Sequence, residues 1–375
     1  MAANQKRTNV SENSGKKGQT AQKRKGSKRK MIVFGVELVV IMAMVGVLYL
    51  VMNTSTAGPK VTVLDPEDLA IPEEIQQAKE EDPENKMRGY MNIALFGVDA
   101  RTDKQLLKGS RSDSTMIASI NLDTGDIKLV SIYRDTYLNT GSKYTKCNAA
   151  YSYGGAEQAI KMLNMNLDMD IENFVTVGYK GLSEVIDGLG GVYIDVDSAE
   201  LKHINNYQID VAKVLGCDYI PVKDTGYQLL NGVQATAYCR IRYTKGDDFK
   251  RTARQREVIK AIEEQAKKAD LASLQSAFNG AIDDIYTSLD TDTILELLSH
   301  ITEYRIVEEA GFPHEDMRTV ANVGAVGSSI IPMDLESNVI WLHQFLFDDE
   351  DYTVTNSVRE YGAKIAADTE PYIKD

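Results

Sequence analysis

Charged residues of both signs stand at the ends of three predicted strands. Asp99 and Arg101 follow the first strand, Arg111 and Asp113 begin the second, and Arg134 ends the third. Two carboxylates can hold one hard divalent cation through oxygen ligands, and arginine is suited to bidentate contacts with phosphate. The pattern is compatible with phosphoryl chemistry at a Mg²⁺ or Mn²⁺ ion bound by the two aspartates. The alternative is that these are solvated turn charges and local Arg–Asp pairs.

A second basic group follows later in the chain. If residues 238–243 are extended, Arg240 and Arg242 point to the same face. Two guanidinium groups on one face are costly to bury unless an anion meets them. We therefore predict that this pair binds an anion.

The next segment predicts a helix that begins at Asp248, because aspartate is a good N-cap residue. At about 100° per residue, Arg251 and Gln255 fall on the apolar side of this helix, and Arg254 falls at the edge of that side. Arg256 is predicted to point the opposite way, into solvent. Strand and helix would direct four arginines to one place, which favours a phosphate site over a plain solvated cluster.

Three short apolar runs position the first group of charges. They are Asn92–Val98, Ser114–Ile120 and Ile127–Tyr133, each rich in β-branched residues and bounded by turn signals, which predicts strands. The six residues 121–126 join the last two runs and favour a hairpin with Gly125 at positive φ. The charges would then collect at one edge of a sheet, where ligands usually bind in α/β proteins.

Downstream elements alternate between helix and strand. Helices are predicted at Ala156–Leu167 and Lys180–Leu189, and strands at Asn173–Gly178 and Gly191–Val196. Such alternation favours an α/β class. We predict a central mixed or mostly antiparallel sheet flanked by helices, in an α-β-α sandwich.

The sequence also resembles a known family. The segments GVDAR, RSDSTM, SIYRDTY, KCNAAYSYGG and GLGGVYIDV occur in the order seen in the LytR-CpsA-Psr family of wall-glycopolymer transferases, and the resemblance runs from about residue 90 to 262. It implies a polyprenyl tunnel in the interior and catalytic roles for Asp99, Asp113 and Arg134. The family's pyrophosphate-binding pattern matches Arg101, Arg111, Arg240, Arg242, Arg251, Arg254 and Gln255.

The activity implied by this resemblance is a phosphoryl transfer at the cell wall. A glycan phosphate, of a teichoic-acid-like or capsular polymer, would move from an undecaprenyl-pyrophosphate carrier to a muramic-acid hydroxyl of peptidoglycan and form a phosphodiester. Two alternatives remain open. The same site could hydrolyse polyprenyl pyrophosphates, or a non-catalytic membrane protein could bind lipid-linked sugars and regulate other proteins.

The charge distribution predicts a membrane anchor. Residues 1–30 carry a net charge of +9 and are predicted to form a disordered cytoplasmic tail. Residues 31–52 hold a single charge, Glu37, and at about 1.5 Å per residue they span the ~30 Å hydrocarbon core. The flanking basic block places the N-terminus in the cytoplasm and the C-terminal domain outside. A cleaved signal peptide is the alternative, although the apolar run is longer than usual for one.

The remaining residues divide into a linker, a domain and a tail. We predict an extracytoplasmic linker at 53–88, a catalytic domain at 89–349 and an acidic, peripheral extension at 350–375. Residues 53–375 carry a net charge of −21, which excludes nucleic acid as a partner of this part. The sequence has no P-loop, HExxH, CxxC or GxSxG motif. Cys147 and Cys239 are predicted to be buried free thiols.

Overall fold

The computed structural model describes residues 60–100, 102–242 and 247–373. The predicted tail at 1–30 and the predicted transmembrane helix at 31–52 lie outside these residues. Within the described ranges, no helix combines the length and apolar character needed to cross a bilayer.

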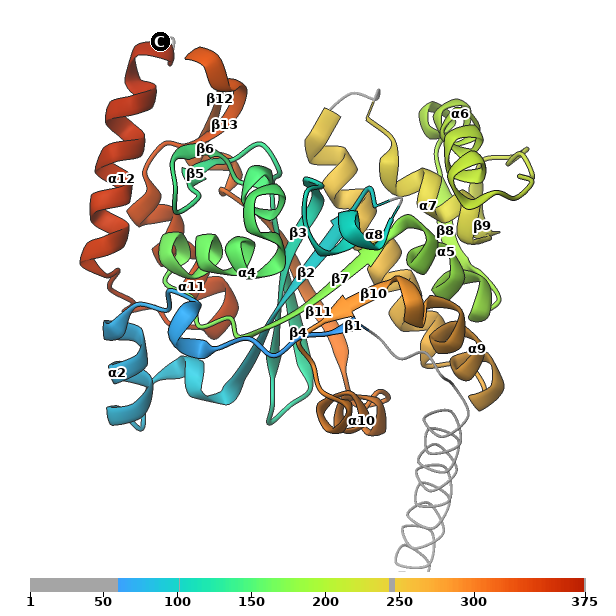
Figure 1. Ribbon diagram of the computed structural model, residues 1–375, viewed down its shortest axis with the longest axis horizontal. Coiled ribbons are helices and arrows are strands. Elements are labelled where there is room, and N and C mark those ends of the chain that lie inside the picture. Colours follow the sequence, from blue (N-terminus) through green and yellow to red (C-terminus); the bar gives the residue numbers. More distant parts are fainter. Residues whose placement is uncertain (1–59, 101, 243–246, 374–375) are drawn as a thin grey trace, which may run out of the picture. The chain divides into compact units, whose positions relative to one another are not determined.

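A seven-stranded mixed sheet forms the centre of the domain (Figure 1). Its strands, in spatial order, are β1 (Lys60–Val61), β10 (Ile285–Thr287), β7 (Asn173–Gly178), β2 (Tyr90–Val98), β3 (Ser112–Asn121), β4 (Asp126–Ile132) and β11 (Arg305–Phe312). The neighbours β1–β10, β7–β2 and β4–β11 are parallel, and the other three neighbours are antiparallel. The predicted mixed α/β sheet is therefore confirmed.

The direction of the central strands brings the predicted charges together. The turn between β3 and β4 contains Gly125 at φ 74°, as predicted for this hairpin. Strand β3 is antiparallel to both β2 and β4. The end of β2, the start of β3 and the end of β4 therefore lie at the same sheet edge, which places the residues after Val98, those around Ser112 and those after Ile132 close in space.

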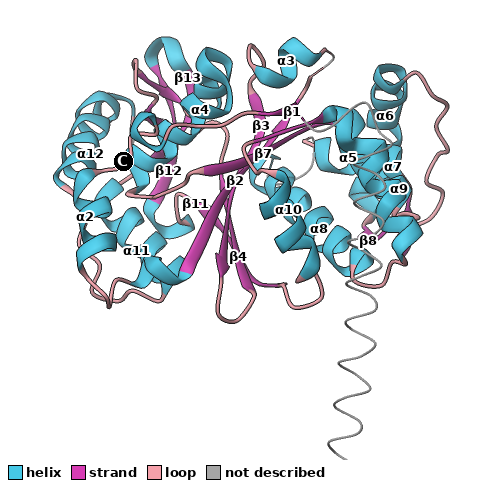
Figure 2. Ribbon diagram, turned by 60° about the horizontal axis from the view of Figure 1, so that its bottom comes forward, coloured by secondary structure: helices cyan, strands magenta, loops and turns pink. Residues whose placement is uncertain are grey.

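Helices cover both faces of the sheet (Figure 2). One layer contains α2 (Glu73–Glu81), α4 (Asn148–Leu167), α11 (Leu335–Phe347) and α12 (Asn356–Thr369). The other side holds α5 (Tyr179–Gly188), α6 (Ser198–Leu215), α7 (Gly232–Arg240), α8 (Asp247–Ala266), α9 (Leu271–Ala281) and α10 (Thr291–Ser299). A short helix, α3 (Asp103–Leu107), connects β2 to β3. The buried apolar side chains form two clusters. One joins the first helix layer to β2, β3 and β4, and the other joins α5, α6, α7 and α8 to one another and to residues 192–196.

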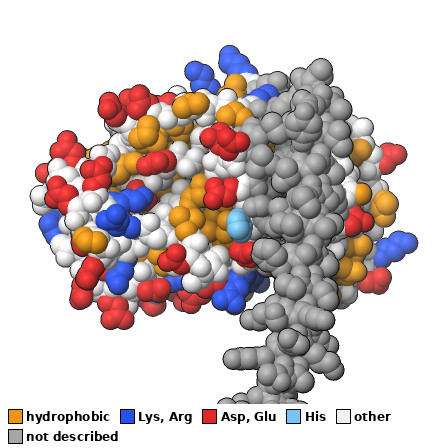
Figure 3. Space-filling view, turned by 90° about the horizontal axis from the view of Figure 1, so that it is seen from below, with side chains coloured by type: hydrophobic (Ala, Val, Ile, Leu, Met, Phe, Trp, Pro, Cys, Tyr) orange, Lys and Arg blue, Asp and Glu red, His pale blue; other side chains and the backbone are white. Residues whose placement is uncertain are grey.

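Three two-stranded sheets complete the described part of the chain. They are β5 (Tyr137–Asn139) with β6 (Tyr144–Lys146), β8 (Val192–Val196) with β9 (Gly226–Leu230), and β12 (Arg318–Val323) with β13 (Gly327–Pro332). The strand predicted at 191–196 is therefore present, but it pairs outside the main sheet. Acidic side chains are spread over the face in Figure 3, in keeping with the net charge of −13.

The helix predicted at Ala156–Leu167 is present as the second part of α4. Helix α4 starts at Asn148 and is kinked at Gly154 and Gly155. A Cβ atom on Gly155 would lie 2.4 Å from the carbonyl oxygen of Leu107, and its φ of 72° also requires glycine. The glycine pair thus separates a short first helical segment from the segment that starts at Ala156, as predicted.

Both predicted domain boundaries need correction. The segment predicted as a linker at 53–88 joins the domain from Lys60 onward, because β1 pairs with β10 and Leu69 lies in the core. The acidic extension predicted at 350–375 is not peripheral. Helix α12 packs on α11 and α4, and buries Val358 and Ile365 completely or almost so.

The predicted thiols are confirmed. Cys147 and Cys239 are buried and free, and burial raises the pKa of both thiols to about 12. Cys217 is free and exposed. The two buried cysteines therefore act as small core residues.

Helix α11 contains a buried histidine from which we expect the stability of the domain to depend on pH. The imidazole of His343 is fully buried, donates from Nε2 to the carbonyl oxygen of Leu167 at 3.0 Å, and stacks on Tyr352. Burial lowers the pKa of His343 to about 4. The unfolded chain takes up this proton below about pH 6.5, so the free energy of unfolding should fall by about 1.4 kcal/mol per pH unit between there and pH 4.

Urea unfolding at about pH 7.5 and pH 5 tests this expectation. Between these values the native protein should lose about 2 kcal/mol more than His343→Gln, which keeps a donor for Leu167 but does not titrate. Burial raises the pKa of Asp168, whose contribution runs the opposite way and is common to both proteins. Equal losses in the two proteins would contradict the assignment.

Candidate active site

A cavity of about 360 Å³ opens at the sheet edge where the charges collect. Its charged and polar lining includes Asp99, Asp113, Arg240, Arg242, Arg251 and Gln255. Its apolar lining includes Leu95, Phe96, Met116, Leu182, Val258 and Ile259. The cavity can therefore receive a molecule that has both an anionic and an apolar part.

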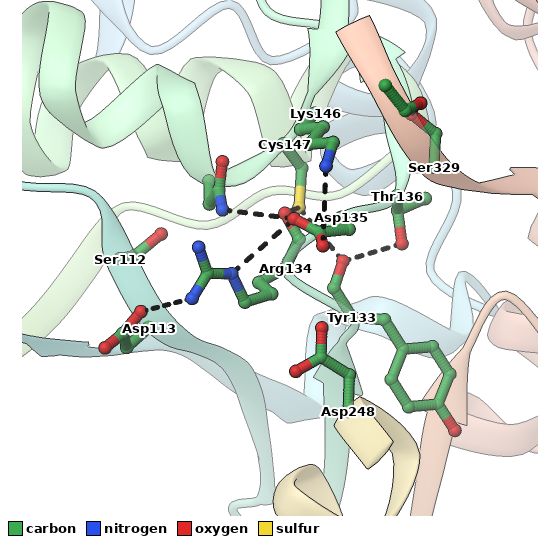
Figure 4. A network of polar contacts seen from close by, with 12 residues as sticks. Ser112, Asp113, Tyr133, Arg134, Asp135, Thr136, Lys146, Cys147, Asp248 and Ser329 are labelled. Atoms are coloured by element: carbon green, nitrogen blue, oxygen red, sulfur yellow. Dashed lines mark hydrogen bonds and ion pairs between the residues drawn. The ribbon is translucent and has the colours of Figure 1, made fainter. Parts of the chain in front are cut away.

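Asp113 and Arg134 form the closest ion pair at this edge (Figure 4). Arg134 Nη1 donates to Asp113 Oδ1 at 2.6 Å, and the Arg134 Nε atom lies 3.5 Å from Asp135 Oδ1. Lys146 Nζ lies 3.5 Å from the other oxygen of Asp135. Carboxylates on two sides fix the plane of the Arg134 guanidinium, which stands beside the cavity rather than among its lining residues.

Asp113 has two further partners. The hydroxyl of Tyr179 donates to Asp113 Oδ2 at 3.2 Å, and Arg242 Nη2 donates to Oδ1 at 3.5 Å. Burial and the charge of Asp113 raise the pKa of the Tyr179 phenol, which therefore remains a donor. Tyr179 is a site residue that the sequence analysis missed. Its position directly after β7, at the same sheet edge, is the signal that points to it.

The cavity contains guanidinium groups with unused donors. Arg251 is 2% exposed, its Nη2 donates to the backbone oxygen of Asp113 at 3.4 Å, and it pairs with Asp248 at 3.2 Å. Among the described residues, no hydrogen-bond acceptor reaches Nε or Nη1 of Arg251, or the buried Nη1 of Arg240. Buried donors without acceptors are costly, and an anion in the cavity would remove that cost.

Arg240 and Arg242 line the cavity, but they do not lie on the predicted strand. Residues 238–240 form the last turn of α7 rather than part of a strand. This helix begins after Asn231, whose side chain forms a capping box with Gln234. Ile241 is the C-cap residue of this helix. Both arginines nevertheless line the cavity.

Arg254 lies outside the cavity, contrary to the predicted set. It is 3% exposed, its Nε donates to Glu200 at 2.7 Å, and its Nη1 donates to the carbonyl oxygen of Ile241 at 3.1 Å. Its guanidinium also lies 5.8 Å from the ring centroid of Tyr238. The carboxylate of Glu200, on α6, already pairs with the guanidinium of Arg254, so the contacts of Arg254 are those of a structural residue.

The prediction that Arg256 points into solvent is wrong. It does face away from the cavity, but it is 9% exposed and packs against the sheet. Its Nη1 donates to Ser131 of β4 at 2.9 Å, and its Nε lies 3.9 Å from Glu309 of β11. The Arg251 side of α8 faces the cavity and its Arg256 side packs on β4 and β11, so neither of these sides is open to solvent.

The remaining predicted residues divide into three cases. Asp99 lines the cavity, and Gln255 does so from α8. Arg111 is exposed and is not among the lining residues. Arg101 lies outside the described residues.

Two carboxylates of the cavity offer oxygen ligands for a metal. Within the described ranges, no cluster of three or more His, Cys, Asp or Glu side chains has metal-binding geometry. Asp99 and Asp113 nevertheless share the cavity, and Mg²⁺ is commonly bound by one or two carboxylates together with substrate phosphates. The donor set therefore fits a cation that is completed by a phosphate ligand.

Comparisons with known proteins identify chains that are similar to this one. The LytR_cpsA_psr family model matches residues 64–329. The polyisoprenyl-teichoic acid–peptidoglycan teichoic acid transferase TagU of Enterococcus faecalis is 27% identical over 73% of this chain and 83% of its own length. TagV of Bacillus subtilis, which carries the same transferase description, is 30% identical over 53% of this chain and 49% of its own length.

The fold is shared with solved structures. The crystal structure of B. subtilis TagT is similar with a TM-score of 0.53 and 24% identity, over 72% of this chain and 95% of that one. The family model matches more than half of the chain, over residues 64–329. This chain belongs to the LytR_cpsA_psr family.

Proposed function

We propose that this protein transfers a glycan phosphate from a polyprenyl-pyrophosphate carrier to peptidoglycan. The observation that carries the proposal is the pair Arg240 and Arg251, each of which has at least one buried nitrogen without an acceptor among the described residues, beside an apolar cavity wall. A pyrophosphate would accept those hydrogen bonds, and a polyprenyl chain would cover the apolar residues. Relatives described as teichoic acid transferases support the same reaction.

In the proposed reaction, an acceptor hydroxyl of peptidoglycan attacks the phosphorus that bears the glycan. The new bond joins the acceptor oxygen to that phosphorus, and the bond from phosphorus to the bridging oxygen breaks. Polyprenyl phosphate leaves, and one of the two carboxylates, Asp99 or Asp113, takes the hydroxyl proton. Arg134, Arg242 and Arg251 stabilise the charge that spreads over the phosphoryl oxygens in the transition state.

The arginines of the cavity are held in place before a ligand binds, which suits phosphoryl transfer. Phosphoryl transfer depends mainly on holding the reactants in line and on stabilising charge, with little covalent chemistry from the protein. The ion pair of Arg134 with Asp113, at 2.6 Å, and the contact of Arg251 with the backbone of Asp113 fix these cations before a ligand arrives. A preorganised cluster of this kind costs little reorganisation during the reaction.

A divalent cation is part of the proposal. Asp99 and Asp113 would hold Mg²⁺ or Mn²⁺, which would supply charge neutralisation at the pyrophosphate when bound. We expect Asp99→Asn to abolish more than about 90% of turnover and to weaken binding of Mn²⁺ measured by its paramagnetic signal. Glu172→Gln, at an exposed position away from the cavity, is the control. Full turnover in the presence of a chelator would show that the carboxylates act without a metal.

Residues 31–52 are proposed to anchor the protein as a single-pass helix, with the N-terminus in the cytoplasm and the C-terminal domain outside. The basic segment that precedes the apolar run supports this orientation. We expect protease added to wall-stripped cells to digest residues 60–375. Complete protection of that part would exclude a cell-wall acceptor.

A reconstituted reaction separates the transferase from a phosphatase. With a synthetic lipid-linked donor and a peptidoglycan oligomer, mass spectrometry should detect a phosphodiester between glycan and muramic acid. Release of polyprenyl phosphate should depend on the acceptor, because a transferase must keep water from the phosphorus. Equal release without acceptor, and no linked product, would favour the phosphatase. A protein that binds the donor but releases nothing would favour the regulatory alternative.

A further inference from the structure

Two tyrosine rings enclose the guanidinium of Arg240. Its Cζ atom lies 4.7 Å from the ring centroid of Tyr179, the first residue of α5, and 5.7 Å from that of Tyr207 in α6. All three residues line the cavity. A cation within about 6 Å of an aromatic face is attracted to it. The rings therefore hold Arg240 without using its N–H groups.

The hydroxyl of Tyr179 has a second task. It donates to Asp113 Oδ2 at 3.2 Å, while Arg134 occupies Oδ1 at 2.6 Å. One side chain thus contacts a cation through its ring and a carboxylate through its hydroxyl. Tyr179 therefore links the two charged groups through two different kinds of contact.

The contrast with Arg254 shows why this matters. Arg254 is held by the carboxylate of Glu200, which neutralises its charge and accepts its hydrogen bond. Arg240 is held by ring faces, and its Nη1 has no acceptor among the described residues. Without the ring of Tyr179, the nearby carboxylate of Asp113 would attract Arg240 and compete with an incoming phosphate.

We propose that Tyr179 is a positioning residue that keeps Arg240 available to an anion through its ring and orients Asp113 through its hydroxyl. Tyr207 forms the second wall around Arg240. The inference rests on the proposed function, because it assigns these tasks within a pyrophosphate site.

Substitutions at Tyr179 separate the two tasks. Binding of a short-chain polyprenyl pyrophosphate to the full chain in detergent is measured by calorimetry, and turnover is measured with the lipid-linked donor. Tyr179→Phe should bind within about twofold of the native protein but turn over about tenfold more slowly, because only the hydrogen bond to Asp113 is lost. Tyr179→Leu should also weaken binding, by about tenfold, because the ring is lost. Tyr227→Leu, at an exposed position on β9, should match the native protein in both measurements.

A double-mutant cycle tests whether Tyr179 acts through Arg240. In the Arg240→Ala background, Tyr179→Leu should weaken lipid binding by no more than about twofold further, since the group that it holds is gone. If it still costs tenfold, the ring acts on something other than Arg240 and the inference is overturned. Tyr207→Leu removes the second ring that contacts the same guanidinium. It should weaken lipid binding by about threefold, and this loss should also disappear in the Arg240→Ala background.

The outcomes distinguish this inference from the function on which it rests. If the native protein neither binds the lipid pyrophosphate nor turns over the donor, the proposed function and the inference both fail. If the native protein is active and the folded Tyr179 variants match it, the inference alone fails. Urea unfolding of each variant shows whether the protein remains folded. If Tyr179→Leu does not fold, Tyr179→Phe, which keeps the aromatic ring, still tests the hydrogen bond to Asp113.

Discussion

Replacing Arg134 with lysine should lower turnover of the lipid-linked donor by about 10²- to 10³-fold, the scale found when one positioned donor is removed from a catalytic site. Lysine keeps the positive charge but loses the planar fork that reaches Asp113 at 2.6 Å and Asp135 at 3.5 Å. The loss should appear mainly in kcat, because the charge that needs stabilising develops in the transition state.

Arg359→Lys provides a matched control for this substitution. Arg359 is an exposed arginine of α12 that pairs with Glu336 at 3.7 Å, and it is not among the cavity residues. Its replacement should leave turnover unchanged. Steady-state kinetics with the synthetic donor and a peptidoglycan oligomer measure both variants. If folded Arg134→Lys retained native kcat, the guanidinium of Arg134 would have no part in the chemical step.

Replacing Arg254 with alanine should destabilise the domain by about 3–5 kcal/mol, because it leaves a buried carboxylate without its partner. Glu200 is 6% exposed and accepts the hydrogen bond from Arg254 Nε at 2.7 Å. The substitution also frees the carbonyl oxygen of Ile241, which precedes the cavity residue Arg242. Urea unfolding, followed by fluorescence, gives the change in free energy directly.

A second variant separates stability from phosphate binding. Arg254→Met combined with Glu200→Gln removes both charges. Glu200 Oε2 accepts a hydrogen bond from the backbone N–H of Asp197 at 3.0 Å, and the amide oxygen of the glutamine can accept the same bond. This double variant should recover most of the lost stability, since replacing both members of a buried ion pair is often close to neutral. It should also bind the lipid pyrophosphate about as well as the native protein. Native stability together with lost lipid binding in Arg254→Ala would instead support the phosphate-binding role that the family pattern implies.

Local patterns were sufficient to predict the charged sheet edge. The strands Asn92–Val98, Ser114–Ile120 and Ile127–Tyr133 agree with β2, β3 and β4 to within two residues at each end. Apolar alternation and turn residues are properties of short segments, so they can be recognised without tertiary information. The antiparallel order then places Asp113 beside Arg134.

The domain boundaries could not be predicted in the same way. Acidic composition suggested that residues 350–375 are peripheral, yet Val358 and Ile365 of α12 pack into the core. Asp168, at the end of α4, accepts hydrogen bonds from the backbone and side chain of Thr355 and from Tyr352, and so fixes the start of that helix. These partners are more than 180 residues apart in the sequence, beyond the reach of any local pattern.

By itself, the sequence determined the α/β class, the sheet edge that carries Asp99 and Asp113, and the phase of the arginines on α8. Tertiary structure decided what each arginine meets. A helical period fixes directions around the helix axis but does not say what lies in those directions. Arg251 meets the cavity, Arg254 meets Glu200 of α6, and Arg256 meets Ser131 of the sheet. Three arginines within six residues therefore have different surroundings, because α8 is enclosed on several sides by elements distant in the chain.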